Sequence, residues 1–600
     1  MGINPVAERD DSGYKRNKKN NYRAKLGFDI KIPYVDGLKF NALFSYVRGA
    51  NHSKSFLTPY SLYLLGDDGS VANERIFGKT SLSEEMYIGN NMTSTLTLTY
   101  NKKIKGHSMS GLLVYEQFES LGSTLGASRT NFPFTSIDQL FAGGDDEEQS
   151  NWGTPAQDAR KGLIGRFNYD YKGKYLAEFS FRYDGSLKFH PDRRWGFFPS
   201  VSLGWRLSEE AFMKKFSNLD NLKVRGSYGI LGNDAVGGWQ WLTNYSFGNA
   251  YIFNQAPIKS IVSGGIPNVD LTWEKTATFN FGVDASIYKG LLAVEADVFY
   301  KRTYDILGSR NASMPQTFGA TLPSENYGIV KVKGFELQVK HDNKIGDFRY
   351  HVGGNVSWSR NKVIEKDYAA GAEPWNIPVG KTMGYRACFV ALGLFQSDEE
   401  AAAWPRFKGT QPTAGDVKYA DLNNDGIMDE RDKKVVSPYS NTPEIMFGLN
   451  LSASWKGFDF SALFQGAANR NVMLSGFATQ MFINGASNLP KYLYEDHWTP
   501  DNRDACYPKA WGPDHPSNNK SSTFWLINGN YVRLKNVELG YSISKDLLSR
   551  VGVDRLRIYV GGSNLFSIDH MPGYDPEKQD GGPNYYPQQR VFNMGVNITF

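Results

Sequence analysis

Apolar and polar residues alternate strictly over one stretch in the first third of the chain. From Tyr175 to Tyr183 every second residue is apolar, and the positions between them are polar, as at Glu178 and Arg182. This period of two is typical of a β-strand with one apolar and one polar face. Aromatic residues flank the alternation on both sides: Tyr169, Tyr171, Trp195, Phe197 and Phe198. Roughly ten alternating residues between aromatic girdles predict a strand that crosses a membrane.

The same pattern recurs in pairs of strands that are joined by short turns at one end and long loops at the other. A tight turn at Lys172-Gly173 and a long loop over residues 116–160 are examples. We expect further strands at residues 22–32, 38–46, 92–100, 107–115, 222–228, 276–287, 292–300, 332–340, 348–358, 445–455, 458–464, 531–543, 556–560 and 592–600. Pattern matching gives about 17 strands, within two. Many exceed the five or six residues usual in sandwiches, so the predicted fold is all-β, an antiparallel transmembrane β-barrel with long extracellular loops.

Composition agrees with a barrel and excludes a bundle of membrane helices. The 600 residues contain no run of about 18 apolar residues, which a spanning helix would need. A barrel puts only every second strand residue on lipid, which fits the mean hydropathy of −0.45. The net charge of +5 says little about partners, and we expect no nucleic-acid ligand.

The last strand carries the same two-faced pattern up to the final residue. Phe592, Met594, Val596 and Ile598 share one face with Phe600, where the sequence stops. An outward apolar stripe that ends on an aromatic residue predicts a membrane anchor at the interface, with Phe600 as the terminal anchor residue.

The first residues and the two cysteines bear on export. Residues 1–20 form a polar segment, followed over 21–600 by the predicted barrel portion. The stretch from Met1 to Lys25 has no apolar core and no small-residue cleavage site, so we expect a missing front end. Cys388 and Cys506 lie far apart and outside any CxxC pattern, which favours two unpaired thiols over a disulfide.

Several stretches together resemble the C-terminal barrel portion of SusC/RagA-like TonB-dependent outer-membrane transporters. The resemblance runs from about residue 20 to the end, and no single motif would carry it alone. The stretches are GRFNYDYKGKYLAEFSFRYDGSLKF, RRWGFFPSVSLGWR, LKVRGSYGILGN, LTWEKTATFNFGVDASIYKGLL, KGFELQV, GDVKYADLNNDG, YVRLKNVELGYSIS and the terminal Phe600.

The resemblance implies a place in the cell outer membrane, in contact with outer-membrane lipid. It further implies energised import of glycan oligosaccharides or peptides too large for porins. The implied partners are a SusD-like surface lipoprotein that lids the barrel and, for the full-length protein, the TonB-ExbB-ExbD complex. Barrels of this family have about 22 strands, with a plug domain and a TonB box ahead of them.

The sequence departs from the family in its front part. Neither a plug nor a TonB box is visible, and the strand count falls short, so we expect a C-terminal fragment or a truncated product. An open sheet leaves the backbone groups of two edge strands unpaired, which is costly in hydrocarbon. We therefore expect the first strand, Tyr22 to Ile32, to pair with a strand outside this sequence, with a smaller closed barrel as the alternative.

One loop has the spacing of a calcium site. An EF-hand-like loop binds calcium through oxygen atoms at positions 1, 3, 5, 7, 9 and 12, of which position 7 supplies a backbone carbonyl. In this sequence these positions are Asp421, Asn423, Asp425, Ile427, Asp429 and Asp432, and Gly426 stands at position 6. Position 12 departs from the pattern because Asp432 replaces the usual Glu. A structural Ca²⁺ ion and a plain Asx-rich turn are both compatible with this spacing.

Two long loops rich in aromatic residues are candidates for substrate contact. The residues we single out are Trp239, Trp241, Tyr245, Trp498 and Trp511, which are interleaved with Asn, Asp and His. Flat aromatic faces beside polar groups suit sugar rings or peptide side chains. Aromatic residues in such loops also pack the loops together or contact a partner protein, and the choice between glycan and peptide stays open.

Catalytic motifs are missing from the sequence. There is no HExxH, GxSxG or CxxC motif, and the GKT triplets at 78–80 and 380–382 lack the upstream glycine of a phosphate loop. We therefore expect no enzyme. Two alternatives remain at this point: a soluble all-β binding module, which would bury the apolar faces in a protein core, and a barrel-embedded hydrolase.

Overall fold

One large antiparallel sheet dominates the structure, a computed structural model that describes residues 4–144, 148–253, 256–318, 322–482, 489–511, 517–544, 548, 552–581, 586 and 588–600. The sheet has 17 strands, each paired with its neighbours in chain order. Its strands are β1 (Gly13–Lys31), β2 (Leu38–Leu57), β5 (Ser81–Ile104), β6 (His107–Thr130), β7 (Gln149–Tyr171), β8 (Tyr175–Ser186), β9 (Trp195–Arg206), β10 (Leu219–Asn233), β13 (Glu274–Ile287), β14 (Leu292–Gly308), β15 (Glu325–Ile345), β16 (Phe348–Glu365), β23 (Ile445–Trp455), β24 (Phe458–Ala468), β27 (Tyr531–Ser542), β28 (Arg555–Asp569) and β29 (Val591–Thr599).

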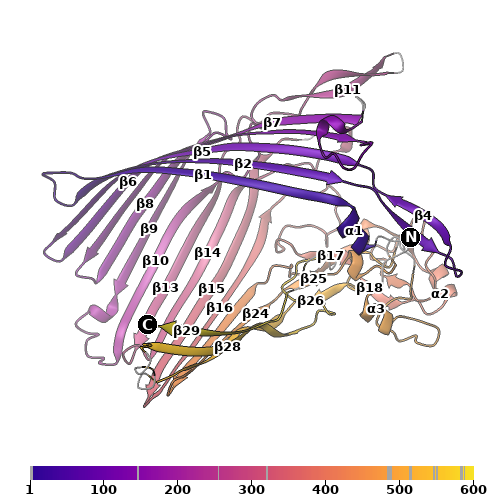
Figure 1. Cartoon of the computed structure of the whole chain (residues 1–600). Coiled ribbons are helices and arrows are strands. Elements are labelled where there is room, and N and C mark those ends of the chain that lie inside the picture. The colour runs from indigo at the N-terminus through magenta and orange to yellow at the C-terminus, as the bar shows by residue number, and fades with distance from the viewer. Residues whose placement is uncertain are drawn as a thin grey trace.

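The sheet is open between its first and last strands. Over the described residues β1 pairs only with β2, in a register that runs from Gly13↔Leu57 to Lys31↔Lys39. Among the residues that the structure describes, β29 likewise pairs only with β28. Figure 1 shows β1 and β29 as the two free edges of a curved sheet. The predicted strand count is confirmed, and the structure shows an open edge at the first strand rather than a smaller closed barrel.

Several strands are longer than the sequence predicted. β1 begins at Gly13 rather than at Tyr22. The predicted long loop over 116–160 is wrong at both ends, because β6 continues to Thr130 and β7 begins at Gln149. The added portion of β1 is polar on both faces from Lys15 to Asn21. Those of β6 and β7 carry only scattered apolar residues, such as Leu121, Leu125 and Trp152. The regular alternation that marked the spanning portions is absent from these stretches.

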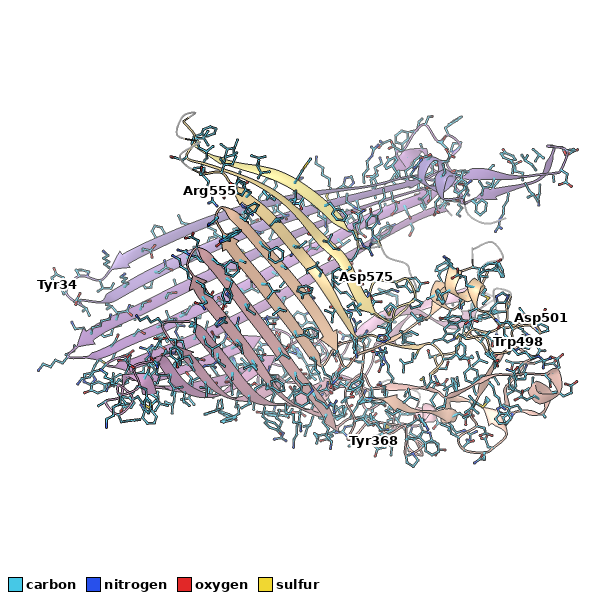
Figure 2. All side chains as sticks on the ribbon, turned by 90° about the horizontal axis from the view of Figure 1, so that it is seen from below. Tyr34, Tyr368, Trp498, Asp501, Arg555 and Asp575 are labelled. Carbon is cyan, nitrogen blue, oxygen red and sulfur yellow. The ribbon has the colours of Figure 1, made fainter. Side chains whose placement is uncertain are left out.

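Short turns join the strands at one end, as predicted. Lys172 and Gly173 both have positive φ, 54° and 67°, and Lys456 and Gly457 repeat this geometry with 46° and 90°. Two successive residues with positive φ are the requirement of the type I′ turn, whose twist matches that of paired strands. Tyr34, in another turn of this end, lies far from Trp498 at the opposite end of the molecule (Figure 2).

The outer face of the sheet is apolar and exposed. Leu203 on β9 is 63% exposed, and Phe179 and Tyr183 on β8 lie open on the same face. A soluble all-β module would bury these side chains against a second layer.

The long connections fold into a second region beyond one end of the sheet, which we call the loop lobe (Figure 1). It consists of β17 (Arg386–Phe389), β18 (Ala391–Leu394), α2 (Asp398–Ala403), β19 (Arg406–Phe407), β20 (Val417–Tyr419), β21 (Ile427–Met428), β22 (Lys433–Ser437), β25 (Asn471–Met473), α3 (Lys491–Glu495) and β26 (Leu526–Asn528). Its largest core packs Val472, Met481 and Leu493 around Trp525.

The remaining elements are short. They are α1 (Pro5–Asp11), the hairpins β3 (Tyr60–Leu65) with β4 (Val71–Phe77) and β11 (Tyr245–Phe253) with β12 (Ala256–Ser263), and single 3₁₀ turns at Leu140–Ala142, Leu207–Glu209, Gln316–Phe318, Glu430–Asp432 and Gly476–Ala478. Within the described ranges, every helix is too short or too polar to cross a bilayer.

Candidate ligand-binding site at the barrel mouth

The inner face of the sheet is a polar wall in which opposite charges are paired. The Arg182 guanidinium donates to the Asp184 carboxylate at 2.8 Å. On the next strands, Arg225 contacts Asp284 at 3.1 Å and Asp297 at 2.6 Å. Arginine offers a planar fork that fits carboxylates at fixed geometry, so each of these charges has a partner of opposite sign.

A cavity of about 780 Å³ lies where the inner wall meets the loop lobe. Its wall includes one cross-strand row, in which Glu295 pairs in register with Gln338 and Gln338 with Asn355. Glu336 and Gln465 add polar groups from neighbouring positions. The volume falls within the range of small-ligand sites, and carboxylate and amide groups can both bind hydroxyl and amide hydrogens.

The loop between β28 and β29 closes one side of this mouth through ion pairs. Arg533, almost fully buried on β27, donates to Asp575 at 2.8 Å and to Glu577 at 3.0 Å. Arg386 of the loop lobe forms a two-point pair with Asp580 at 2.7 Å. In Figure 2, Asp575 lies where the last strands reach the loop lobe. The loop therefore ties barrel and lobe together.

Arg470 completes this junction beside the cavity. It is 3% exposed and donates to the backbone carbonyls of Pro576 at 2.5 Å and Lys578 at 2.7 Å. Burial lowers the pKa of its guanidinium. No local motif marks Arg386, Arg470 and Arg533 in the sequence, because their partners lie 42 to 194 residues away.

Two of the predicted aromatic contact residues lie inside the loop lobe. Trp511 belongs to the core around Trp525. Trp498 is 8% exposed, and its ring covers Gly415, where an added Cβ would come within 2.5 Å of it. Both rings contact neighbouring loop residues, as expected if they pack the loops together. A substrate role for Trp498 and Trp511 stays a prediction.

The other three predicted aromatic residues lie on a different loop. The rings of Trp239 and Trp241 are 6.1 Å apart, and Trp241 also meets His190 edge to face at 5.3 Å. Tyr245 begins β11 and is exposed. Figure 1 shows β11 well apart from α3, which precedes Trp498, so the structure does not bring the two aromatic sets together.

The predicted calcium loop folds as a turn with internal hydrogen bonds. Asp421 accepts from the amide of Gly426 at 2.9 Å, and Asn423 accepts from the amide of Asp425 at 3.1 Å. Asp432 is fully buried, and it accepts from the amides of Leu422 at 2.8 Å and Asp429 at 2.9 Å. The carboxylate at position 12 thus already stabilises the loop backbone.

An arginine lies among the predicted calcium ligands. Arg431 contacts the carboxylates of Asp425 and Asp429, and its hydrogen bonds hold the pKa of Asp429 below the ordinary value. In the part of the chain that the structure describes, no three His, Cys, Asp or Glu side chains converge on a point that could hold a metal ion. Ca²⁺ binding by Asp421, Asn423, Asp425, Ile427, Asp429 and Asp432 stays a prediction, and it would require Arg431 to move.

The cysteines are free, as predicted. Cys388 is buried and Cys506 is exposed. Burial raises the pKa of the Cys388 thiol to about 11, so this thiol stays protonated and unreactive near neutral pH.

Taken together, these features define the class of protein. The 17-stranded antiparallel sheet has tight turns at one end and a lobe of long loops at the other. Its outer face is apolar, and its inner face carries paired ions. This combination is the wall of a large transmembrane β-barrel. The final residues fit this class, since Phe600 follows β29 with an exposed side chain.

The chain belongs to the family of TonB dependent receptor-like β-barrels, whose pattern matches residues 2–565. It is 26% identical to the TonB-dependent receptor P3 of Formosa agariphila, a match that covers all of this chain and 60% of that protein. It is 24% identical to the TonB-dependent receptor SusC of Bacteroides thetaiotaomicron, with 100% and 57% covered. The chain therefore spans somewhat more than half the length of these two relatives.

A solved structure has the same fold. The RagAB peptide transporter aligns with a TM-score of 0.77 at 22% identity, over 98% of this chain and 62% of that one. Family membership places the chain in the outer membrane, in a family of transporters rather than of enzymes or soluble binding modules.

Proposed function

We propose that the chain forms the barrel wall of a transporter that imports glycan oligosaccharides or peptides across the outer membrane, driven by TonB. The observation that carries this proposal is the cavity of about 780 Å³ at the mouth, with polar groups from the inner wall and Arg470 from the loop side. Such a place is where a solute from outside would first meet the lumen.

We also propose that a SusD-like lipoprotein lids this mouth and that the TonB-ExbB-ExbD complex energises import. The support is similarity: relatives are named TonB-dependent receptors, one of them SusC, and the fold matches that of the RagAB peptide transporter. The loop lobe offers a large surface beyond the end of the barrel on which such a lid could rest (Figure 1).

Uptake assays in the native host test the proposal. Cells would receive fluorescent oligosaccharide and peptide pools, with and without a functional TonB, and retained label would be identified by mass spectrometry. The double variant Glu336→Ala with Gln338→Ala removes two polar groups of the cavity, and we expect uptake to fall about tenfold.

The matched control is Phe335→Ala, which lies next to Glu336 on β15 but on the other face of the strand and outside the cavity lining. It should leave uptake nearly unchanged, and all variants should be present in the outer membrane in equal amounts. Uptake that does not depend on TonB, or a cavity variant that imports like the control, would contradict the proposed function.

A further inference from the structure

β1 carries a row of cations on the face that it shares with the inner wall. Successive side chains of a strand point to opposite faces, and the register joins Gly27, Leu43, Thr95, Glu116, Gly162 and Asp184 in one cross-strand row. Asp184 belongs to the ion-paired inner wall, so the odd-numbered residues of β1 face the lumen. They include five cations, Lys15, Lys19, Arg23, Lys25 and Lys31, and one carboxylate, Asp29. We call these five residues the basic row.

The basic row forms no ion pairs within the described structure. None of its five residues forms an ion pair with a described residue, and Asp29 is engaged by the side chain of Asn41 at 2.8 Å. The facing residues of β2 are uncharged or cationic, and Lys31 lies directly opposite Lys39. Like charges opposite each other destabilise a sheet. An anion bound against this face would reduce the repulsion between these cations.

The chemistry of the row differs from that of the paired wall. The wall uses arginines that grip carboxylates at fixed geometry, as Arg182 and Arg225 do. The basic row consists of four lysines and one arginine, and lysine is a flexible point charge that tolerates many positions of its partner. Lys15, Lys19 and Arg23 are four residues apart, about 13 Å along the strand, in the direction that a solute would travel.

We propose that the basic row is a guide for acidic oligosaccharides, whose sugars carry carboxylate or sulfate groups, along the barrel wall. This inference rests on the proposed function, since it names the substrate class of the same import route. Repeated negative charges on a flexible cargo match repeated lysines, and each contact is weak enough to be released as the cargo advances.

The neighbouring strands favour a sugar over an acidic peptide. In register with the row, β2 presents Ser45 and Asn51, and β5 presents Thr93 and Tyr87 beside them. Hydroxyl and amide groups both donate and accept hydrogen bonds, as the hydroxyls of a sugar require.

Binding measurements on the receptor purified from its native outer membrane test the inference. The probes are an oligogalacturonate, a malto-oligosaccharide of equal length and an oligoglutamate of equal charge, at low and at high salt. We expect the oligogalacturonate to bind most tightly, with an affinity that falls as salt screens the charges.

The key variant is Lys19→Gln with Arg23→Gln, which removes two cations of the basic row. Its matched control is Arg16→Gln with Lys18→Gln, which removes the same charge from the opposite face of the same strand. We expect oligogalacturonate affinity to fall about fivefold in the first and less than about twofold in the second.

Three results would overturn the inference: equal losses in the two variants, no preference for oligogalacturonate over the neutral probe, or equally tight binding of oligoglutamate. These are distinct from failure of the proposed function. If import itself is wrongly assigned, the cavity variant Glu336→Ala with Gln338→Ala leaves uptake unchanged. If only the guide is wrong, that variant still lowers uptake.

Discussion

The barrel sheet and the loop lobe use apolar side chains in opposite ways. On the sheet, apolar residues point outward and stay exposed, as Leu203 and Met594 do, the latter at 85%. In the loop lobe they point inward, and Trp525 and Met481 are almost completely buried. The difference shows that one chain is built for two solvents: the lobe buries its own core in water, whereas the sheet needs acyl chains to cover its outer face.

The largest loss of stability should come from removing a large side chain from the core of the loop lobe. Trp525→Ala removes a buried indole and its hydrogen bond to the Asn518 carbonyl at 2.7 Å, which should cost about 4 kcal/mol. Protease cleavage of the loop lobe should then increase in receptor isolated from the native outer membrane. Phe179→Ala on the outer face is the control and should leave the lobe resistant. Equal resistance of both variants would show that the lobe has no core of its own.

A smaller loss should follow from separating the two regions at their junction. Arg533→Ala leaves the carboxylates of Asp575 and Glu577 without their buried partner, at a cost of about 3 kcal/mol. Hydrogen exchange should accelerate in residues 575–580. The control Lys535→Ala removes a more exposed cation, 3.4 Å from Glu577, and should cost about 0.5 kcal/mol. The tie between barrel and lobe would be refuted if the two variants exchange alike.

A charge on the outer face tests the lipid side of the comparison. Phe179→Arg should destabilise the folded receptor in lipid by about 2 kcal/mol, because an arginine near the bilayer centre is poorly solvated. Ser202→Arg on β9 places the same charge on the inner face, opposite Glu178, and should be nearly neutral. Heat-modifiable mobility after refolding into lipid vesicles measures both, and a neutral Phe179→Arg would argue against lipid contact at this position.

The smallest of these effects concerns the predicted Ca²⁺ ion. If it binds, calcium at ten times its dissociation constant stabilises the loop lobe by about 1.4 kcal/mol, less whatever is needed to displace Arg431 from Asp425 and Asp429. Calcium should slow proteolysis of the lobe, and Asp421→Ala with Asp425→Ala should abolish this protection. If calcium does not protect the lobe, or still protects it in the double variant, the loop is a plain Asx-rich turn and not a calcium site.

Much of the barrel could be predicted because its signal is local. Each of its signals spans only a few neighbouring residues: the alternation at Tyr175–Tyr183, the Lys-Gly turns and the terminal apolar stripe. These local patterns were enough to predict the number of strands and the outer face of the sheet. The candidate site could not be predicted in the same way. Arg386 and Asp580 are 194 residues apart, and no periodicity links them. Trp511 is of a residue type that is common in binding sites, but it lies in the core of the loop lobe.

The sequence by itself determined which side chains face lipid and which face the lumen, because strand alternation fixes the face once a strand exists. That includes the alternating stretch at Tyr175–Tyr183. The face of Lys15 and Lys19 on β1 followed only from the strand register, because that portion carries no alternation. Only the tertiary structure decided which charges find partners. Arg182 and Arg225 meet carboxylates on their own or neighbouring strands, while the basic row meets none among the described residues, since register and sheet order set those neighbours over long range.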